Sequence, residues 1–204
     1  MATIRPYRPQ DLEGLYAVCL KTGDSGQDAT TLYRDKHLIG AIYAAPYGRY
    51  APDLAFVVED QGGVAGYIVG AADTRGFEAL LEDRWWPMLR AAHADPQGVP
   101  WAERTPDQHL ERLFHKPNAA PDPVVAAYPA HLHINLLPHL QGQGMGQRLI
   151  DTHLAALKAA GACGVHLGVS EANTRAQRFY DIYGFSRFSE QPTPGTIWMV
   201  RDLA

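Results

Sequence analysis

Three glycines at alternate positions mark the part of the sequence best suited to bind a ligand. Gly142, Gly144 and Gly146 follow an apolar run that ends at Pro138, and an amphipathic stretch of helical period begins directly behind them. Glycine allows a sharp turn and leaves no Cβ between the backbone and a ligand. The N–H groups in the first turn of the helix lack partners, and the helix dipole attracts an anion to them. The sequence therefore predicts a cradle for a phosphate or pyrophosphate group.

Glycine spacing excludes the two best-known phosphate loops. The dinucleotide pattern Gly-x-Gly-x-x-Gly requires glycine at position 147 or 149, where Gln147 and Leu149 stand, and the chain has no Gly-x-x-x-x-Gly-Lys-Ser/Thr run. The repeated β-α units of a dinucleotide-binding domain are also missing. What fits is Gln-x-x-Gly-x-Gly from Gln141 to Gly146, which resembles the coenzyme A loop of the GNAT-type N-acetyltransferases. An ordinary glycine-rich turn between a strand and a helix is the alternative.

A second pattern lies downstream and begins at Asn173. This residue is an N-cap candidate, because its side chain can accept a hydrogen bond from a first-turn N–H group. Gly184 supplies a left-handed helix stop. The run resembles Asn-x-x-Ala-x-x-Phe-Tyr-x-x-x-Gly-Phe, the second signature of the same superfamily. The predicted helix has one apolar face, with residues at i, i+3, i+4 and i+7: Ala176, Phe179, Tyr180 and Tyr183.

The resemblance implies that acetyl-CoA is the cofactor. In that superfamily it lies in a V-shaped gap between two parallel strands that splay apart, with its pantetheine arm along the first strand and its pyrophosphate on the glycine loop. Tyr180 would protonate the departing thiolate as a general acid, although a tyrosine on an apolar helix face is more often a core residue. The implied cofactor-binding residues are Leu136, Leu137, Gln141, Gly142, Gln143, Gly144, Met145, Gly146, Gln147, Asn173 and Tyr180.

The base that deprotonates the acceptor amine is sought on the strand before the loop. His131, His133 and Asn135 alternate onto one face of this strand, opposite Leu132 and Ile134. His133 is the first choice for the catalytic base and His131 the second, and the alternative is that both histidines merely cap a polar sheet edge. Contacts to the acceptor are predicted for Asp24, Asp73, His131 and Asn135, with Ser25 and Asp28 as further candidates in the early loop.

The remaining pattern supplies the elements that would position this site. We predict an α/β protein whose elements follow the order β-α-α-β-β and then β-α-β-α-β-β, which resembles the GNAT fold: a twisted mixed sheet of about seven strands with helices on both faces. A polar Gly-Gly turn at residues 60–63 predicts a hairpin. The expected strands cover residues 3–5, 53–59, 64–71 and 196–200. Two early helices are expected, one that begins at residue 12 and a second that covers residues 30–44.

A helical insertion is predicted between the third and fourth strands, at about residues 73–126. Its first helix has an apolar stripe, and its second begins with Thr105 as N-cap and Pro106 at the first helical position. The insertion either enlarges the core as a packed helical pair or forms a lid over the acceptor pocket, and both can hold. The stripe consists of Phe77, Leu80, Leu81, Trp85, Met88 and Leu89.

The insertion also narrows the family resemblance. Residues 53–59 with Gly66-Tyr67, then Asp73-Thr74, Phe77 and Trp85-Trp-Pro87, look like the C-terminal acetyltransferase-like domain of O-GlcNAcases, and the resemblance runs from about residue 22 to the end. That domain does not carry the glycosidase chemistry of those proteins. Animal versions look as if they have lost the glycine loop, which this chain keeps, so cofactor binding is expected here.

Composition is that of an ordinary globular protein. The chain has 204 residues, of which 46% are apolar and 20% charged, so we expect a single domain over residues 1–204. It has no apolar run near 18 residues and no signal segment, which predicts a cytoplasmic protein that does not enter membranes. Cys19 and Cys163 lack metal-ligand spacing and are expected to be buried thiols, and no metal site is predicted. A net charge of −4 argues against nucleic-acid binding.

These inferences give two hypotheses about function. The first is an acyl-CoA-dependent N-acetyltransferase in which an amine attacks acetyl-CoA directly, without a covalent enzyme intermediate. The main-chain N–H near Leu136 would polarise the thioester carbonyl. The alternative is a non-catalytic acetyl-CoA-binding interaction domain. The acceptor would be a small-molecule or peptide amine, and the sequence predicts neither its identity nor the oligomeric state.

Overall fold

A single mixed sheet organises the chain in the computed structural model, which describes residues 2–189 and 193–203. Among those residues the sheet has seven strands in the order β1-β2-β3-β4-β5-β7-β6. The strands are β1 (Thr3–Pro6), β2 (Phe56–Asp60), β3 (Gly63–Ala71), β4 (Ala130–Leu136), β5 (Gly164–Ser170), β6 (Ser186–Arg187) and β7 (Thr196–Asp202). The predicted fold class and strand number are confirmed.

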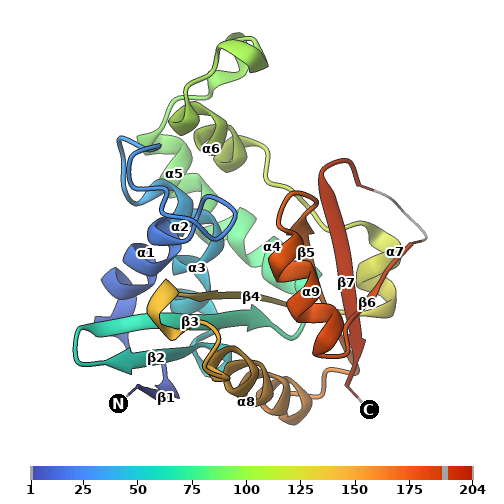
Figure 1. Cartoon of the computed structure of the whole chain (residues 1–204). Coiled ribbons are helices and arrows are strands. Elements are labelled where there is room, and N and C mark those ends of the chain that lie inside the picture. The colour runs from blue at the N-terminus through green and yellow to red at the C-terminus, as the bar shows by residue number, and fades with distance from the viewer. Residues whose placement is uncertain (1, 190–192, 204) are drawn as a thin grey trace.

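The centre of the sheet splits between two parallel strands. All other neighbours are antiparallel, whereas β4 and β5 are parallel and pair only where Ala130 and His131 face Val165 and His166. Beyond that point β5 and β7 turn away from β4, as Figure 1 shows. The sheet therefore opens into a wedge along the C-terminal half of β4.

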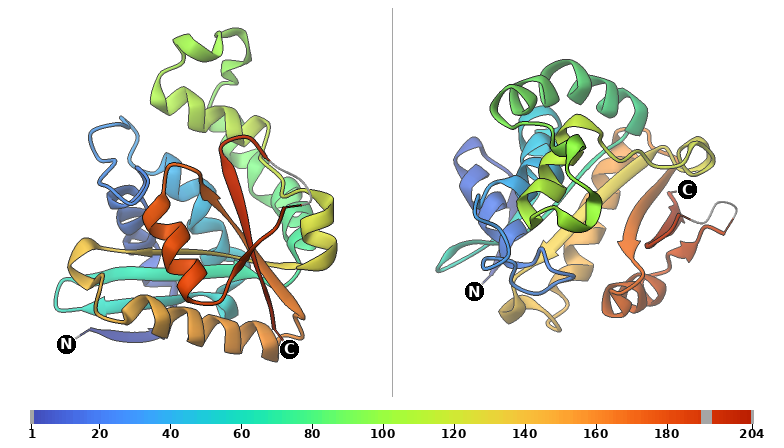
Figure 2. Two further views of the ribbon diagram at one scale, coloured as in Figure 1. Left: turned by 45° about the vertical axis from the view of Figure 1, so that its right-hand side comes forward. Right: turned by 90° about the horizontal axis from the view of Figure 1, so that it is seen from above.

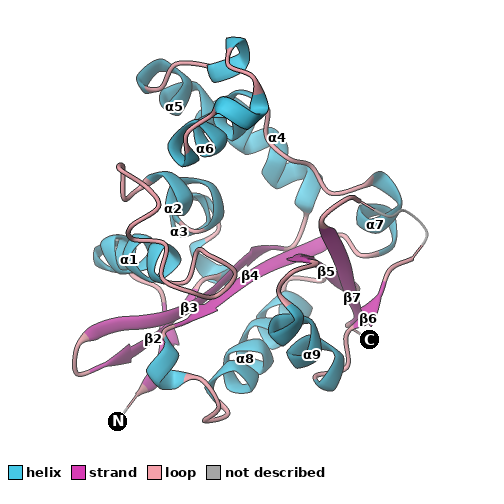
Figure 3. Cartoon of the chain, turned by 45° about the horizontal axis from the view of Figure 1, so that its top comes forward, coloured by secondary structure: helices cyan, strands magenta, loops and turns pink. Residues whose placement is uncertain are grey.

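Helices cover both faces of the sheet. Figure 3 shows α8 and α9 on one face and α1, α2 and α3 on the other. The helices are α1 (Leu12–Lys21), α2 (Leu38–Tyr43), α3 (Ala45–Tyr50), α4 (Thr74–Arg84), α5 (Trp86–Ala92), α6 (Pro106–His115), α7 (Asp122–Ala127), α8 (Met145–Ala159) and α9 (Thr174–Ile182).

Strand alternation divides the interior into two apolar clusters. Successive side chains of a strand point to opposite faces of a sheet. Tyr67 and Val69 of β3 therefore pack with α1, α2 and α3. Ile68 of β3 and Leu132 of β4 pack with α8 and α9 on the other face. The sheet is thus buried on both sides, and the wedge between β4 and β5 links the two layers.

The early part of the chain differs from prediction in one element. The hairpin is confirmed, with Asp60 paired to Gly63. The helix predicted over residues 30–44 is wrong, because α2 begins only at Leu38 and α3 follows as a separate short helix. Polar side chains hold the preceding segment in turns: Asp28 accepts from the Thr30 N–H, and Asp35 from the His37 N–H. Such local bonds compete with a helix for the backbone donors.

The second strand also starts later than predicted. The expected range was residues 53–59, but Pro52–Leu54 form a short 3₁₀ turn and β2 begins at Phe56. Proline at the first position of that turn has the backbone φ angle that a helical turn needs. β2 pairs antiparallel with β1 and with β3, and the pairing with β3 shifts register between Val58 and Glu59.

The insertion contains four helices between β3 and β4, whereas two were predicted. The expected stripe breaks at Trp85, where α4 ends and α5 begins with Pro87 in its first turn, and Met88 is left 56% exposed. Thr105 and Gln108 form the capping box at the start of α6, so the predicted N-cap is confirmed. The segment between α5 and α6 projects away from the sheet, as Figure 2 shows.

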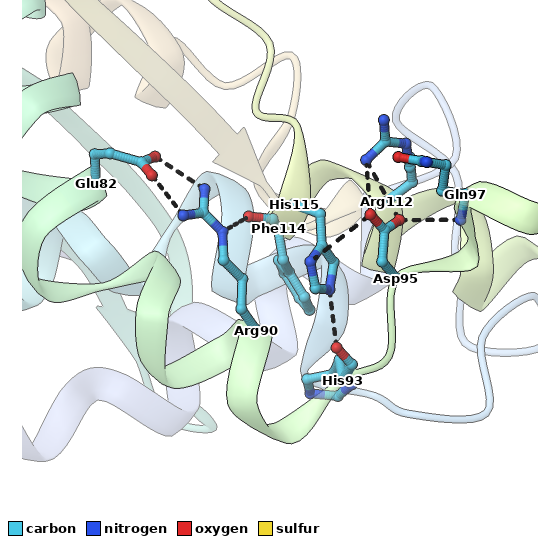
Figure 4. A network of polar contacts seen from close by, with 8 residues as sticks. All are labelled: Glu82, Arg90, His93, Asp95, Gln97, Arg112, Phe114 and His115. Carbon is cyan, nitrogen blue, oxygen red and sulfur yellow. Dashed lines mark hydrogen bonds and ion pairs between the residues drawn. The ribbon is translucent and has the colours of Figure 1, made fainter.

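Polar contacts tie the helices of the insertion together (Figure 4). Arg90 of α5 pairs with Glu82 of α4 and donates to the Phe114 carbonyl of α6. Asp95 accepts from the Gln97 N–H and pairs with Arg112. Three helices of the insertion are thus joined, and the phenyl ring of Phe114 is fully buried.

The two cysteines have different environments. Cys19 is buried in the core, as predicted, whereas Cys163 is exposed in the turn before β5, so the prediction for Cys163 is wrong. No helix among the described residues is long and apolar enough to cross a membrane.

Candidate active site

The glycine loop forms the turn from β4 into α8. Gly142 and Gly144 have φ angles of 73° and 74°, in the left-handed region that favours glycine, and Gly144 is the N-cap of α8. A Cβ at Gly146 would lie 3.2 Å from the ring of Phe179 on α9. The turn is therefore tight, and the first N–H groups of a 15-residue helix are available at it.

A cavity of about 430 Å³ opens between this loop, the edge of β4 and α9. Its volume lies within the range of small-molecule sites. The loop and both neighbouring elements contribute to its walls. The lining residues are Ile134, Leu136, Gln141, Gly142, Gly144, Gly146, Gln147, Arg175, Ala176, Phe179 and Tyr180. The structure thus brings together much of the predicted cofactor site, and Gln143, Met145, Leu137 and Asn173 lie outside this lining.

The strand edge at the wedge is available for backbone pairing. In an antiparallel pair, alternate residues direct both backbone groups at the partner strand. Leu137 donates its N–H to the Ala65 carbonyl in the segment that pairs with β4, so its backbone faces away from the wedge. By the same alternation, Ile134 and Leu136 direct their backbone groups into the wedge. The Leu136 carbonyl there accepts from the Gln141 side chain at 2.8 Å.

Arg175 is a cavity residue that the sequence reasoning missed. It is the second residue of α9, and its guanidinium donates to the Gln141 side chain at 2.5 Å, across the mouth of the cavity. The early loop comes close to the same group, because a Cβ at Gly26 would lie 2.8 Å from it. Arg175 stands at an unnamed position of the second signature, so only the three-dimensional contact identifies it.

Asn173 acts as the helix cap that was predicted. Its side-chain oxygen accepts from the Ala176 N–H at 3.1 Å and so begins α9. The cap directs α9 along the wedge, because Ala176, Phe179 and Tyr180 then fall on the face that meets the cavity. Gly184 ends this segment with a φ angle of 87°, as predicted.

Tyr180 is 8% exposed and lines the cavity. Its ring packs edge-on against Phe179 and Phe185, with centroids 5.4 and 5.6 Å away. The hydroxyl makes no hydrogen bond with any described group. Burial raises the pKa of this phenol above its usual value. The hydroxyl is therefore protonated at neutral pH and free to donate.

A second cavity of about 870 Å³ lies on the other side of the wedge. Its lining includes Leu132 and His133 of β4, the residues directly before those that line the first cavity. Residues 167–170 of β5 form the opposite wall. The two cavities thus flank successive parts of the same strand edge. The insertion supplies one side of the larger cavity and also packs into the core, so its predicted packing role is confirmed and its role as a lid stays a prediction.

Five aromatic rings and three histidines are among the residues that line the larger cavity, together with Arg75, Glu78 and Glu82. Its aromatic lining consists of Tyr43, Tyr47, Phe77, Trp86 and Trp198. His131 and His133 both reach the Tyr47 hydroxyl through Nε2, at 2.8 and 3.0 Å. Burial lowers the pKa of His133 to about 4 and that of His131 well below its usual value, so both rings are neutral at pH 7.

The other predicted acceptor contacts serve local structure. Asp73 accepts from the Gly76 N–H as the N-cap of α4. Asp24 forms a tight turn with Gln27, and Asn135 donates to the Thr22 hydroxyl at 2.6 Å. None of Asp24, Asp73 and Asn135 lines either cavity. Among the described residues there is also no cluster of histidine, cysteine and carboxylate side chains that could hold a metal ion.

Comparison with known proteins agrees with this geometry. Residues 24–185 match the model of the acetyltransferase (GNAT) family. The crystal structure of SsHAT is 40% identical, with a TM-score of 0.92 over 100% of this chain and 98% of that one. The O-GlcNAcase of Rattus norvegicus is 26% identical over 89% of this chain, which spans only 20% of that relative. The acetyltransferase yncA of Salmonella typhimurium, solved with acetyl-CoA, shares the fold at 15% identity and a TM-score of 0.58, over 100% of this chain and 95% of that one. The chain therefore belongs to the GNAT family of N-acetyltransferases.

Proposed function

We propose that the chain is a catalytically active acetyltransferase that binds acetyl-CoA in the wedge between β4 and β5 and transfers the acetyl group to an amine in the larger cavity. The observation that carries this proposal is the wedge itself. A glycine-rich anion site lies at one side of it and a cavity of about 870 Å³ at the other. A thioester held along the edge of β4 would present its acyl group where the two cavities meet. Binding of acetyl-CoA by the related fold of yncA supports the choice of cofactor.

The residues present fit this cofactor. The N–H groups at the start of α8 suit a pyrophosphate, because they are free and the helix dipole is positive there. Arg175 adds a cation at the cavity mouth. The backbone of Ile134 and Leu136 offers the strand edge to an amide-bearing arm, and the Leu136 N–H suits the carbonyl of the reacting thioester. Acetyl-CoA, when bound, supplies the activated acetyl group as that thioester.

Protein side chains would manage the two proton transfers. His133 would take the proton that the amine nitrogen loses as it bonds to the acyl carbon, and Tyr180 would give its proton to the sulfur as the carbon–sulfur bond breaks. Solvent then restores both side chains to their neutral forms. No side chain becomes acylated, so Cys19, buried on α1, has no part in this scheme.

The acceptor class, the domain and the location complete the proposal. The aromatic walls suit an amine carried on an apolar or aromatic framework, in a small molecule or a peptide. We place residues 1–204 in one acetyltransferase domain, because both apolar clusters pack on the same sheet. We also propose a cytoplasmic location, where an exposed free thiol such as Cys163 stays reduced.

Calorimetric titration with acetyl-CoA tests the cofactor site. In the Gly146→Glu variant, a carboxylate enters the cavity at the start of α8, where it would repel a pyrophosphate. Gly98→Glu is the matched control, since Gly98 is exposed in the insertion and a Cβ there meets nothing within 4 Å. We expect binding by the native and control proteins and loss of binding in Gly146→Glu, with all three folded by thermal melting.

Release of free coenzyme A thiol with a panel of amines tests catalysis. Turnover with one amine class, lost in Gly146→Glu, would support the proposal. Binding of acetyl-CoA without acetyl transfer to any amine would favour the alternative, a non-catalytic binding domain. Failure of the folded native protein to bind acetyl-CoA would refute both.

A further inference from the structure

A continuous chain of hydrogen bonds connects His133 to the backbone of the segment before β4. It runs from His133 Nε2 to the Tyr47 hydroxyl at 3.0 Å, and from there to His131 Nε2 at 2.8 Å. His131 Nδ1 contacts the Thr74 hydroxyl at 2.8 Å, and that hydroxyl contacts the Pro129 carbonyl at 2.7 Å. Residues from β4, α3 and α4 thus share one line of contacts beside the larger cavity.

The carbonyl at the end of this series of hydrogen bonds fixes which group donates in every one of them. A carbonyl oxygen only accepts, so the Thr74 hydroxyl donates to Pro129 and accepts from His131 Nδ1. Neutral His131 then has a lone pair on Nε2, which requires the Tyr47 hydroxyl as donor. The Tyr47 oxygen in turn accepts from His133 Nε2. Each hydroxyl has one proton, so no other arrangement satisfies all four contacts while both rings are neutral.

His133 is consequently the Nε2–H tautomer, with its lone pair on Nδ1. This nitrogen has no hydrogen-bond partner among the described residues, yet it is not among their buried unpaired side-chain atoms, which belong to Tyr67 and His153. It is therefore not fully buried, and His133 itself lines the larger cavity. The chain thus leaves one nitrogen of one histidine free to accept a proton.

We propose that Tyr47 and Thr74 are positioning residues that hold His133 in the tautomer whose Nδ1 accepts the proton of the acceptor amine, Tyr47 by direct contact and Thr74 through His131 and Tyr47. This inference rests on the proposed acetyl transfer, with His133 as its base. On protonation at Nδ1, His133 becomes an imidazolium that still donates from Nε2 to the Tyr47 oxygen. None of the hydrogen-bonded groups has to move for His133 to accept the proton.

The surroundings of His133 keep this arrangement neutral. Its neighbours are Tyr43 of α2, with ring centroids 5.7 Å apart, Tyr47 of α3, His131 of the same strand and His166 of β5. The charged groups that act on the chain are one step further out: Glu78 acts on Tyr47 and Arg75 on His166. No carboxylate contacts either histidine among the described residues, so nothing there favours an imidazolium at rest.

The tautomers can be read directly by nitrogen NMR of the whole protein with ¹⁵N-labelled histidine, at pH 7 and without ligands. We expect a protonated Nδ1 in His131 and a protonated Nε2 in His133. In Tyr47→Phe, which retains the ring stacked on Phe77, His133 should become a mixture of tautomers. Tyr50 is on the same helix but takes no part in this series of hydrogen bonds, so Tyr50→Phe should leave the nitrogen signals of His131 and His133 unchanged.

Kinetics supply the second readout. Tyr47→Phe should lower kcat at least about tenfold, within the roughly 10²–10⁴-fold that a general base contributes, and leave the Kd of acetyl-CoA unchanged. Thr74→Val should act in the same direction, and Thr74→Ser, which retains the hydroxyl, should restore most of the rate.

Two results would overturn the inference. One is a native His133 protonated on Nδ1 at pH 7, and the other is a folded Tyr47→Phe protein in which His133 keeps a single tautomer. Absence of acetyl transfer would refute the proposed function while leaving the tautomer measurement intact, so the two failures are distinguishable.

Discussion

Replacing Tyr180 by phenylalanine separates its catalytic role from a structural one. The hydroxyl makes no hydrogen bond with any described group, so its removal breaks no internal contact. The ring packing against Phe179 and Phe185 depends only on the aromatic carbons, which phenylalanine keeps. Loss of a satisfied buried hydrogen bond would cost about 1 kcal/mol, and here that cost is absent. We therefore expect a free energy of unfolding within about 0.5 kcal/mol of native.

The same change should have a large effect on rate. A general acid contributes roughly 10²–10⁴-fold, so kcat should fall by at least about a hundredfold. The assay is thiol release at saturating acetyl-CoA with an acceptor from the amine panel, combined with calorimetric binding of acetyl-CoA, which should be unchanged. A folded Tyr180→Phe protein with native turnover would refute the assignment of Tyr180 as the acid. A loss of stability above about 1 kcal/mol would show instead that the hydroxyl has a structural partner.

Two further predictions concern stability. His153 is fully buried, and neither ring nitrogen makes a hydrogen bond of normal geometry, although the nearby Leu54 carbonyl slightly favours the charged form. Burial lowers the pKa of His153 to about 4, whereas the same histidine in the unfolded chain has a pKa near 6.5. Below pH 6.5 the unfolded state therefore binds more protons than the folded state, and stability falls as the pH falls. Between pH 7 and pH 5 the free energy of unfolding should therefore fall by about 2 kcal/mol because of His153. The His153→Leu variant should lack this fall when urea unfolding is measured at both pH values. An equal fall in the native protein and the variant would contradict the prediction. Thr105→Ala removes the cap of α6 and should cost about 1 kcal/mol in the same assay, whereas an unchanged midpoint would show that α6 needs no cap.

The loop and the helix cap at which we propose cofactor binding were largely predictable, because they depend on local backbone geometry. The left-handed φ angles at Gly142 and Gly144 favour glycine, and glycine is visible in the sequence. The cap at Asn173 is also local, since it accepts from Ala176 three residues later. Elements whose geometry is set by a few neighbouring residues are therefore visible in one sequence.

The acceptor side was less predictable, because it depends on contacts between distant segments. His133 was selected from strand alternation, but its partner Tyr47 lies 86 positions earlier in sequence. Thr74 reaches His131 across 57 positions. No periodicity relates such residues, so the sequence identified the face of β4 and not the hydrogen bonds on it.

Several aspartates near the ends of elements have local roles in the backbone instead. Asp73 was predicted as an acceptor contact because it follows a strand, yet an aspartate there satisfies the free N–H groups of the next helix. Asp28 and Asp35 similarly fix turns that prevent the helix expected over residues 30–44. Polar residues near element boundaries serve the backbone first, and sequence alone does not separate that use from binding.

One physical cause would prepare both side chains to which we assign a proton transfer. Burial disfavours the charged form of any group, so it raises the pKa of Tyr180 and lowers that of His133. At pH 7 the phenol therefore keeps its proton and the imidazole keeps its lone pair. Environments that move two pKa values apart in this way separate an acid from a base. Because His133 is a weak base, it accepts a proton readily only from an acidic nitrogen, which the amine becomes once it has bonded to the acyl carbon. The histidine would then act after attack begins, and the tautomer chain through Tyr47 ensures that the accepting nitrogen is already free.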